Sequence, residues 1–153
     1  MQVAVLGAGG IGRGYIAFLA DKGHQTTLWS PSGKSTKAFA EGAPLAASGE
    51  VSGNFSPTIA TTCQAALENA DVVLIAVPGN AHRMVMDQAA PHLHPDQIVI
   101  ISSHCSLSAL YLSKLLAERG VQIPIAAWAT TFLAGRSQGE TGVGISTIRK
   151  TLD

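Results

Sequence analysis

The glycines after the first apolar segment are the residues of this 153-residue chain best suited to bind a ligand. Gly7-Ala8-Gly9-Gly10-Ile11-Gly12 fits the pattern G-x-G-x-x-G, between a short apolar run and an amphipathic segment. In such a turn Gly7 permits the tight bend, Gly9 lets a pyrophosphate approach the backbone, and Gly12 lets a helix pack on the sheet. The free N–H groups of that helix attract phosphate oxygens. The pattern predicts a dinucleotide site; the alternative is a tight strand-to-helix turn without a ligand.

The residues after the second apolar segment bear on which dinucleotide is bound. An NAD site usually has Asp or Glu about 20 residues beyond the glycines, where it accepts the ribose hydroxyls. That segment has no acid here, but it offers hydroxyls at Ser30 and Ser32 and a cation at Lys34. These groups suit the 2′-phosphate of NADP, with Arg13 as a further cation. We expect NADP in preference to NAD; the alternative is that Lys34 and Lys37 form only a solvated face.

Polar residues also follow two later apolar segments, at 77–82 and 102–106. We expect these loops to contribute the following residues to the cofactor pocket: Val77, Pro78, Gly79, His82 and Ser102. His82 has two interpretations, contact with substrate or nicotinamide, or a polar link between its loop and a neighbour. A His104–Cys105 pair is typical of nucleophilic catalysis, but adjacent side chains diverge and no orienting acid is nearby. No residue is assigned a catalytic role; His82 and His104 are the candidates.

Two further groups of polar residues are of types that can bind a ligand or a metal. Thr130 and Thr131, after the last predicted strand, are hydroxyl candidates for the same pocket. His92 and His94 have no cluster of Cys, Asp or Glu to complete a metal site. We expect a solvated turn there and no metal.

Apolar runs indicate the strands that must position these residues, and apolar residues at helical spacing indicate the helices. The predicted strands span 3–6, 25–29, 58–60, 72–77, 98–101 and 124–129, with a further candidate at 142–149. The predicted helices span 11–22, 36–40, 81–90 and a segment from Leu107 that Gly120 ends, with Ser106 as its N-cap. A capping box, Thr61-x-x-Gln64, predicts one more short helix through Asn69. The remainder of 30–57 is expected to be loop.

Strands that alternate with helices form right-handed βαβ units and a parallel sheet. We expect an α/β fold, a doubly wound parallel sheet with helices on both faces and strand order 3-2-1-4-5-6. Ligands of such sheets bind outside the carboxyl ends of the strands, near the switch between strands 1 and 4. This order places Cys63 and Cys105 about 19 Å apart at 4.8 Å per strand. A disulfide needs Cα atoms within about 7 Å, so we expect two reduced thiols.

Composition narrows the class of protein. Apolar residues make up 46% and charged residues 13%, with 10 basic and 10 acidic side chains and a pI near 7.0. Neutral charge argues against nucleic acid or an acidic membrane as partner. No apolar run approaches the roughly 20 residues of a membrane span, and no basic leader is present, which predicts a cytoplasmic location. The low charge suggests an apolar surface covered by another domain or by a second copy in a homodimer.

Three stretches together resemble one family: GAGGIGRGYIAFLADKGHQTTLW, VVLIAVPGNAHRMVMDQAAPHL and IVIISSHCS. They resemble the N-terminal nucleotide-binding (Rossmann) domain of the NAD/NADP octopine (opine) dehydrogenases, with Glu50–Gly53 as that family's glycine-marked insertion. The resemblance implies reductive condensation of an amino acid with a 2-oxo acid, with NADH or NADPH as hydride donor. It also implies that the substrate-activating His and Asp belong to a C-terminal domain, which residues 1–153 lack.

The alternatives use the same layout. Ketopantoate reductases and glycerol-3-phosphate dehydrogenases are similar in these stretches. A stand-alone dinucleotide-binding module without enzymatic activity is the third possibility.

Overall fold

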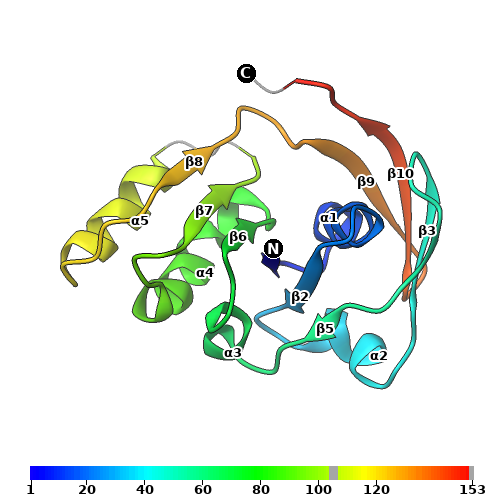
Figure 1. Ribbon diagram of the computed structural model, residues 1–153, viewed down its shortest axis with the longest axis horizontal. Helices are drawn as coiled ribbons and strands as arrows, with labels where there is room; N and C mark the ends of the chain where they lie inside the picture. The colour runs from blue at the N-terminus through cyan, green and yellow to red at the C-terminus, as the bar shows by residue number, and fades with distance from the viewer. Residues whose placement is uncertain (104–106, 152–153) are drawn as a thin grey trace.

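A computed structural model describes residues 1–103 and 107–151 and arranges them in two β-sheets around one helix (Figure 1). The larger sheet has six parallel strands in the order β5-β2-β1-β6-β7-β8. Their bounds are β1 Gln2–Leu6, β2 Gln25–Trp29, β5 Thr58–Ile59, β6 Val72–Ile75, β7 Ile98–Ile101 and β8 Ile125–Ala127. Numbered within this sheet alone, the order is 3-2-1-4-5-6. The predicted doubly wound topology is confirmed.

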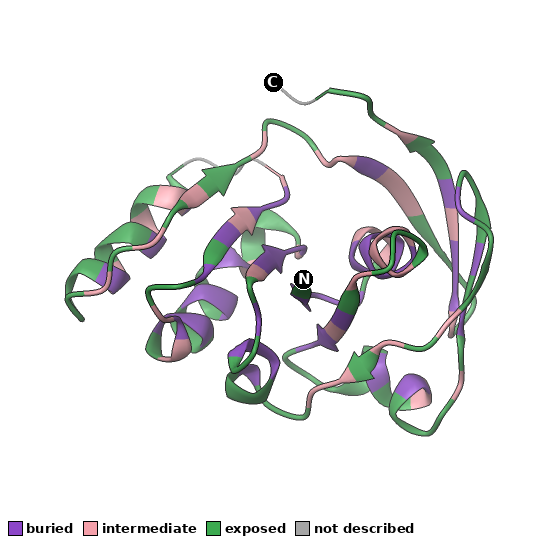
Figure 2. Cartoon of the chain, viewed as in Figure 1, coloured by how far each residue is buried: buried purple, intermediate pink, exposed green. Residues whose placement is uncertain are grey.

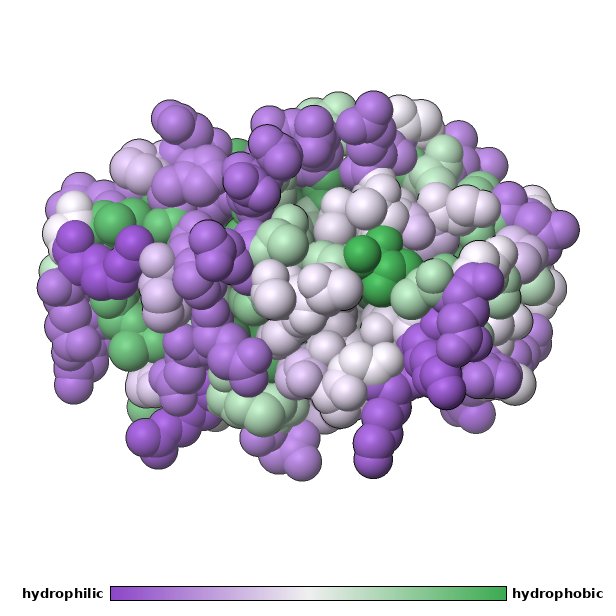
Figure 3. Space-filling view, turned by 90° about the horizontal axis from the view of Figure 1, so that it is seen from below, coloured by the Kyte–Doolittle hydropathy of each residue, from purple (hydrophilic) through white to green (hydrophobic). Residues whose placement is uncertain are grey.

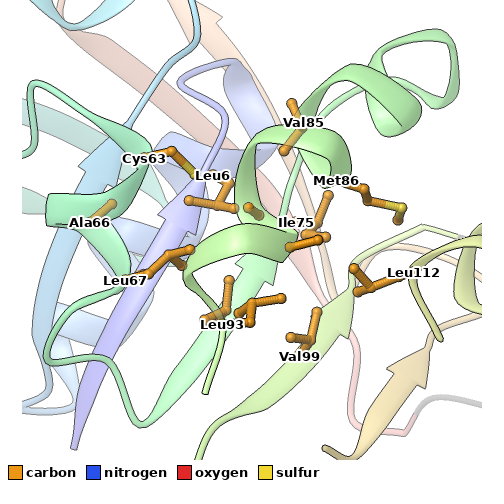
Figure 4. Packing of buried hydrophobic residues seen from close by; sticks show 14 of the residues in the cluster. Leu6, Cys63, Ala66, Leu67, Ile75, Val85, Met86, Leu93, Val99 and Leu112 are labelled. Carbon is orange, nitrogen blue, oxygen red and sulfur yellow. The ribbon is translucent and has the colours of Figure 1, made fainter. Parts of the chain in front are cut away.

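Helices cover the sheet as the alternation of elements predicts. Their bounds are α1 Gly10–Asp21, α2 Lys37–Ala40, α3 Cys63–Leu67, α4 His82–Ala89 and α5 Ser108–Ala117. Single 3₁₀ turns, at 34–36, 79–81 and 90–92, adjoin α2 and α4. Helices α3, α4 and α5 pack on one face of the sheet, where side chains such as Leu67, Met86 and Leu112 meet Ile75 and Val99 (Figure 4). Burial in this core raises the pKa of the Cys63 thiol to about 11.

The other face of the sheet holds α1, and beyond α1 lies the second sheet. Its strands are β3 Leu45–Gly49, β4 Gly53–Phe55, β9 Leu133–Gln138 and β10 Gly142–Ile148, in the order β4-β3-β10-β9. Strand β3 runs parallel to β10, while the other two pairs are antiparallel. The sheet curves around α1, whose buried Tyr15 and Ile16 share a core with Leu45, Leu133 and Val143 (Figures 1 and 2). Helix α1 therefore lies between two sheets.

Several boundaries differ from the predicted ones. Residues 45–49 and 53–55, expected to be loop, are β3 and β4, and β9 occupies a segment for which no strand was expected. The 142–149 candidate is β10, in the second sheet. The N-cap of α3 is Thr62 instead of Thr61, with its Oγ1 accepting from the Ala65 N–H at 3.1 Å. The predicted cap Ser106 lies outside the described residues.

The surface carries few large apolar side chains. On the face seen in Figure 3, strongly hydrophilic residues surround a middle of weakly polar ones, and hydrophobic residues form only small separate areas. Among the described residues, Leu107 and Leu110 are the most exposed large hydrophobic side chains, at 70% and 67%, and they lie together at the start of α5. None of the helices in the described ranges is long and apolar enough to cross a bilayer.

Candidate functional site

The glycine turn joins β1 to α1, and its three motif glycines differ in what surrounds them. Gly7 has φ +125°, and a Cβ there would stand 2.4 Å from the Ala76 carbonyl oxygen. A Cβ on Gly12 would stand 1.8 Å from the Gly7 carbonyl oxygen. Gly9 caps α1 at φ −77°, and a Cβ there would meet no atom within 4 Å. The fold itself requires glycine at two of these positions, whereas the space beside Gly9 is free for a ligand.

A hollow of about 220 Å³ lies beside this turn at the carboxyl edge of the sheet. It brings together the start of α1, the ends of β6 and β7, and the linker after β8. Its lining residues are Gly9, Gly10, Ile11, Ala76, Val77, Pro78, Ser102, Ser103 and Thr131. Six residues expected at the cofactor site are therefore neighbours here: Gly9, Gly10 and Ile11 of the glycine turn, and Val77, Pro78 and Ser102. Thr131 joins them, while Thr130 does not. Ala8 is buried beneath the turn, and Gly79 lines a separate hollow between α4 and α5.

A second hollow, of about 380 Å³, opens between the ends of β2 and β5. The three residues expected near a 2′-phosphate, Ser30, Ser32 and Lys34, all line it. The remaining lining residues are Gly33, Thr36, Lys37, Ala40, Ile59, Ala60 and Thr61. The sequence did not point to Thr61, because it reaches this place only through the pairing of β5 with β2. The two hollows flank the glycine turn and β2 as the two halves of a dinucleotide require.

His82 is 3% exposed and uses both ring nitrogens within the protein. Its Nε2 lies 3.1 Å from the Val77 carbonyl oxygen and its Nδ1 lies 2.9 Å from the Ser108 hydroxyl. Because a carbonyl only accepts, Nε2 donates to Val77, and in the neutral ring Nδ1 accepts from Ser108. The histidine thus fixes the loop after β6 against the start of α5. Direct contact of His82 with a ligand stays a prediction, and His104 lies outside the described residues.

Arg13 does not line the hollow at the end of β2, which does not support its expected contact with a 2′-phosphate there. Its side chain is 6% exposed, and its Nε donates to the Ala8 carbonyl at 3.0 Å. Helical side chains slant toward the helix N-terminus, which carries this guanidinium under the glycine turn. Lys37 is exposed, lines the hollow and pairs with Glu41 at 3.8 Å.

Tyr15 connects the pocket wall to α1. The Phe132 backbone N–H donates to its hydroxyl at 3.2 Å. Burial raises the pKa of Tyr15, while hydrogen bonds with the Ser102 side chain and the Phe132 backbone lower it. Ser102 and Thr131, the neighbour of Phe132, both line the pocket, so one buried hydroxyl supports two of its walls.

Cations for a substrate carboxylate are few near this edge. Arg83 pairs with Asp87 at 3.9 Å on α4, and Arg119 donates to the carbonyls of Ala90 and Leu93. Arg136 is exposed in β9, and its Cα would be 2.9 Å from a Cβ placed on Gly10. Arg136 therefore flanks the glycine turn. In the described ranges, no three His, Cys, Asp or Glu side chains gather as a metal site.

The six-stranded sheet, the glycine turn and the two hollows define a dinucleotide-binding type of domain. The family model for ketopantoate reductase PanE/ApbA matches residues 3–103, and the chain belongs to this family.

Curated relatives extend the match to the whole chain. Opine dehydrogenase of Arthrobacter sp. (strain 1C) is 28% identical over 153 residues, which cover 98% of this chain and 43% of the relative. Glycerol-3-phosphate dehydrogenase (NAD(P)+) of Acidobacterium capsulatum is 29% identical over 136 residues, 82% of this chain and 40% of the relative. The resemblance to the opine dehydrogenases is confirmed. The chain spans about two fifths of the length of these relatives.

A solved structure shares the fold over nearly the whole chain. Octopine dehydrogenase, described with NADH and pyruvate, superposes with a TM-score of 0.84, 16% identity and coverage of 99% of this chain and 42% of that one. At 16% identity the likeness concerns the fold alone. Because the superposition covers 99% of this chain, the shared fold includes the second sheet.

Proposed function

We propose that the chain is the nucleotide-binding domain of an NAD(P)-dependent oxidoreductase of the opine dehydrogenase type. The observation that carries this proposal is the open space beside Gly9, at the N-terminus of α1 and next to the pocket at the ends of β6 and β7. A helix N-terminus with a glycine that leaves its backbone uncovered suits a pyrophosphate. Residues 1–153 constitute one such domain in this proposal.

The residues present suit a dinucleotide along its length. The hollow with Ser30, Ser32 and Lys34 would hold the adenosine half, and the pocket with Val77, Pro78 and Ser102 would hold the nicotinamide half. When bound, the nicotinamide supplies the hydride. The chain's own part is to orient the dinucleotide: Pro78 stiffens the loop after β6, and His82 anchors that loop through the Val77 carbonyl.

NADP is the proposed cofactor, ahead of NAD. The support is the Ser30–Lys34 turn, which places two hydroxyls and a cation in the hollow without a carboxylate among its lining residues. An acid there would repel a 2′-phosphate and attract the ribose hydroxyls of NAD.

Titration calorimetry of the 153-residue chain with NADP+ and NAD+ tests both statements. We expect NADP+ to bind more tightly. Tenfold tighter binding of NAD+ would overturn the preference, and no heat with either dinucleotide would overturn the proposed domain function.

The proposed substrates are an amino acid and a 2-oxo acid, taken by a substrate domain that this proposal requires beyond the nucleotide domain. The support is the match with an opine dehydrogenase over 98% of the chain. NADPH oxidation by the protein with that domain, given pyruvate and a panel of amino acids, tests this assignment. Oxidation that needs the 2-oxo acid but no amine would contradict it.

A second candidate is reduction of ketopantoate or of dihydroxyacetone phosphate. It is favoured by the family match over residues 3–103 and by the glycerol-3-phosphate dehydrogenase relatives. The same assay, with ketopantoate or dihydroxyacetone phosphate in place of pyruvate and the amino acids, distinguishes these substrates from the amine-dependent pair. A stand-alone module would bind the dinucleotide and support none of the three reactions.

We also propose a cytoplasmic homodimer. The support for the dimer is the exposed pair Leu107 and Leu110 at the start of α5 together with the low charge content. Sedimentation equilibrium of the chain and of Leu110→Glu tests it. A monomeric parent chain would contradict the dimer.

A further inference from the structure

Arg13 joins three parts of the chain that are far apart in sequence. Its Nε donates to the Ala8 carbonyl in the glycine turn at 3.0 Å. Its Nη1 donates to the carbonyls of Gly142 and Gly139 at 3.4 and 3.5 Å. The guanidinium also lies over the ring of Phe39, 5.3 Å from the centroid. The residue therefore ties the turn between β9 and β10 to the turn between β1 and α1.

The contact with the Ala8 carbonyl also fixes the N–H of the same peptide group, which belongs to Gly9. A trans peptide points its carbonyl and its N–H in opposite directions, and the described chain contains no cis bond. Because the Ala8 carbonyl points to Arg13, the Gly9 N–H points away from it. Gly9 is the residue with open space beside it. Arg13 thus fixes the direction of a backbone donor at the place where the pyrophosphate is proposed to lie.

The charge of Arg13 is not neutralised by a contacting acid. The three hydrogen-bond partners are neutral carbonyls, and none of the ion pairs in the described ranges includes Arg13. Burial lowers the pKa of Arg13 and the charge of Glu140 raises it, yet a guanidinium stays protonated in proteins. A buried cation without an ionic partner is costly. It persists here beside the N-terminus of α1, where the helix dipole adds a second positive field.

We propose that Arg13 is a positioning residue for the pyrophosphate: it orients the Gly9 N–H through the Ala8 carbonyl and supplies, beside the glycine turn, a positive charge that no contacting acid neutralises. This inference rests on the proposed dinucleotide site. In it, the β9–β10 hairpin is part of the binding apparatus, because Gly139 and Gly142 hold the guanidinium in place. An anion bound in the turn would lie near a guanidinium that has no acid in contact with it.

Two ligands separate this role from a general loss of stability. NADP+ contains the pyrophosphate, whereas adenosine 2′-monophosphate offers only the proposed adenosine and 2′-phosphate contacts. Arg13→Met keeps the aliphatic stem and removes the charge and the donors. We expect it to weaken NADP+ binding at least about tenfold, as the loss of charged hydrogen bonds implies, and to change adenosine 2′-monophosphate less than about twofold. The salt dependence of NADP+ binding should fall at the same time, because one cation is lost.

Three further variants complete the experiment. Arg13→Lys keeps the positive charge but loses the planar set of N–H donors of the guanidinium. We therefore expect an intermediate affinity for NADP+ with the salt dependence of the parent chain. Glu140→Gln alters an exposed side chain near Arg13 and should tighten NADP+ by about twofold at low salt, as expected for an exposed charge. Arg119→Met is the matched control, since Arg119 also donates to two backbone carbonyls, those of Ala90 and Leu93, but far from the turn. It should leave both ligands unchanged.

The outcomes are distinct. Unchanged NADP+ binding by Arg13→Met, or equal losses for both ligands, would overturn the role of Arg13 and leave the proposed site intact. If Arg13→Met does not fold, Arg13→Lys and Glu140→Gln decide: parent-like NADP+ binding in both overturns the inference. A parent chain that binds adenosine 2′-monophosphate and NADP+ equally well would also overturn it, and one that binds neither would overturn the proposed function itself.

Discussion

At the scale of single residues, Gly9 is a position where a substitution should affect ligand binding with little effect on the stability of the fold. A side chain at Gly9 would meet open space at an ordinary φ of −77°. We therefore expect Gly9→Val to abolish dinucleotide binding by filling the pyrophosphate space, while the free energy of unfolding changes by only about 1 kcal/mol, the scale of an N-cap substitution. Calorimetric titration and thermal melting measure the two effects.

Gly12→Ala is the contrasting variant. Its Cβ would stand 1.8 Å from a backbone oxygen, so this substitution should destabilise the chain itself. A melting temperature for Gly9→Val as low as that of Gly12→Ala would show that Gly9 has a structural task, contrary to the proposal.

Lys34 decides the proposed cofactor preference. The side chain is exposed at the mouth of the hollow that also holds Ser30 and Ser32. Charged hydrogen bonds contribute roughly 1.5–3 kcal/mol before screening, so Lys34→Ala should weaken NADP+ by about five- to thirtyfold. NAD+ should be nearly unaffected, because it lacks the 2′-phosphate.

Lys22→Ala is the control for that measurement. Lys22 is also exposed, and it pairs with Asp21 at 3.2 Å beyond the far end of α1. It should change neither affinity. Equal losses of NADP+ and NAD+ in Lys34→Ala would mean that Lys34 contacts a group common to both dinucleotides.

At the scale of elements, α1 and β9 approach each other through glycines. A Cβ on Gly10 would stand 2.6 Å from the Gly135 carbonyl oxygen, and a Cβ on Gly135 would stand 2.4 Å from the Gly10 carbonyl oxygen. One turn further along α1, a Cβ on Gly14 would stand 2.6 Å from the Leu133 side chain. Strand β9 of the second sheet therefore packs directly against the turn at which the proposed ligand binds.

Gly10→Ala should lower the free energy of unfolding by about 1–3 kcal/mol, the range of overpacked sites, since the obstacle is backbone. Gly9→Ala, one residue earlier and in open space, is the matched control and should change it by about 1 kcal/mol or less. The double variant Gly10→Ala/Gly135→Ala should cost less than the sum of its parts, because one displacement of β9 relieves both clashes. Additive losses in urea denaturation would show that the two glycines do not share a contact.

The six-stranded sheet was predictable from the sequence, and the second sheet was not. Strand β6 is buried on both faces from Val73 to Ile75, while β7 is buried on the face of Val99 and Ile101, and both strands are continuous apolar runs. Strand β3 is Leu-Ala-Ala-Ser-Gly and β9 ends in Arg-Ser-Gln, with one face toward solvent. Small and polar residues of this kind are also typical of loops. Only the packing against α1 reveals these segments as strands.

The candidate site, too, was predictable from the sequence only in part. The glycine turn is local, so its pattern and context were sufficient to find it. The contacts of His82 with Ser108 and of Arg13 with Gly142 join residues 26 and 129 positions apart. No spacing rule reaches that far, so the sequence could not show that Arg13 lies beneath the glycine turn.

At the scale of the whole molecule, the two sheets leave the pocket at an open edge. The lining comes from the glycine turn and the start of α1, from the segments after β6 and β7, and from Thr131 in the linker after β8. Hydride transfer requires reacting carbons about 3–3.5 Å apart in a site that excludes water. Under the proposed function, a second body would therefore have to close over the nicotinamide, bind the substrate carboxylates and move a proton.

The chain of 153 residues should accordingly show no appreciable dehydrogenase activity by itself. Carboxylates are usually clamped by Arg, and at this edge of the described chain Arg136 is the fair candidate, since Arg83 and Arg119 have other partners. One arginine does not hold both an amino acid and a 2-oxo acid. The assay is NADPH oxidation by purified residues 1–153 with pyruvate and several amino acids, after calorimetry has shown that NADPH is bound. Turnover approaching that of a typical enzyme, about 10 per second, would place the catalytic groups within this chain and refute the need for a second domain.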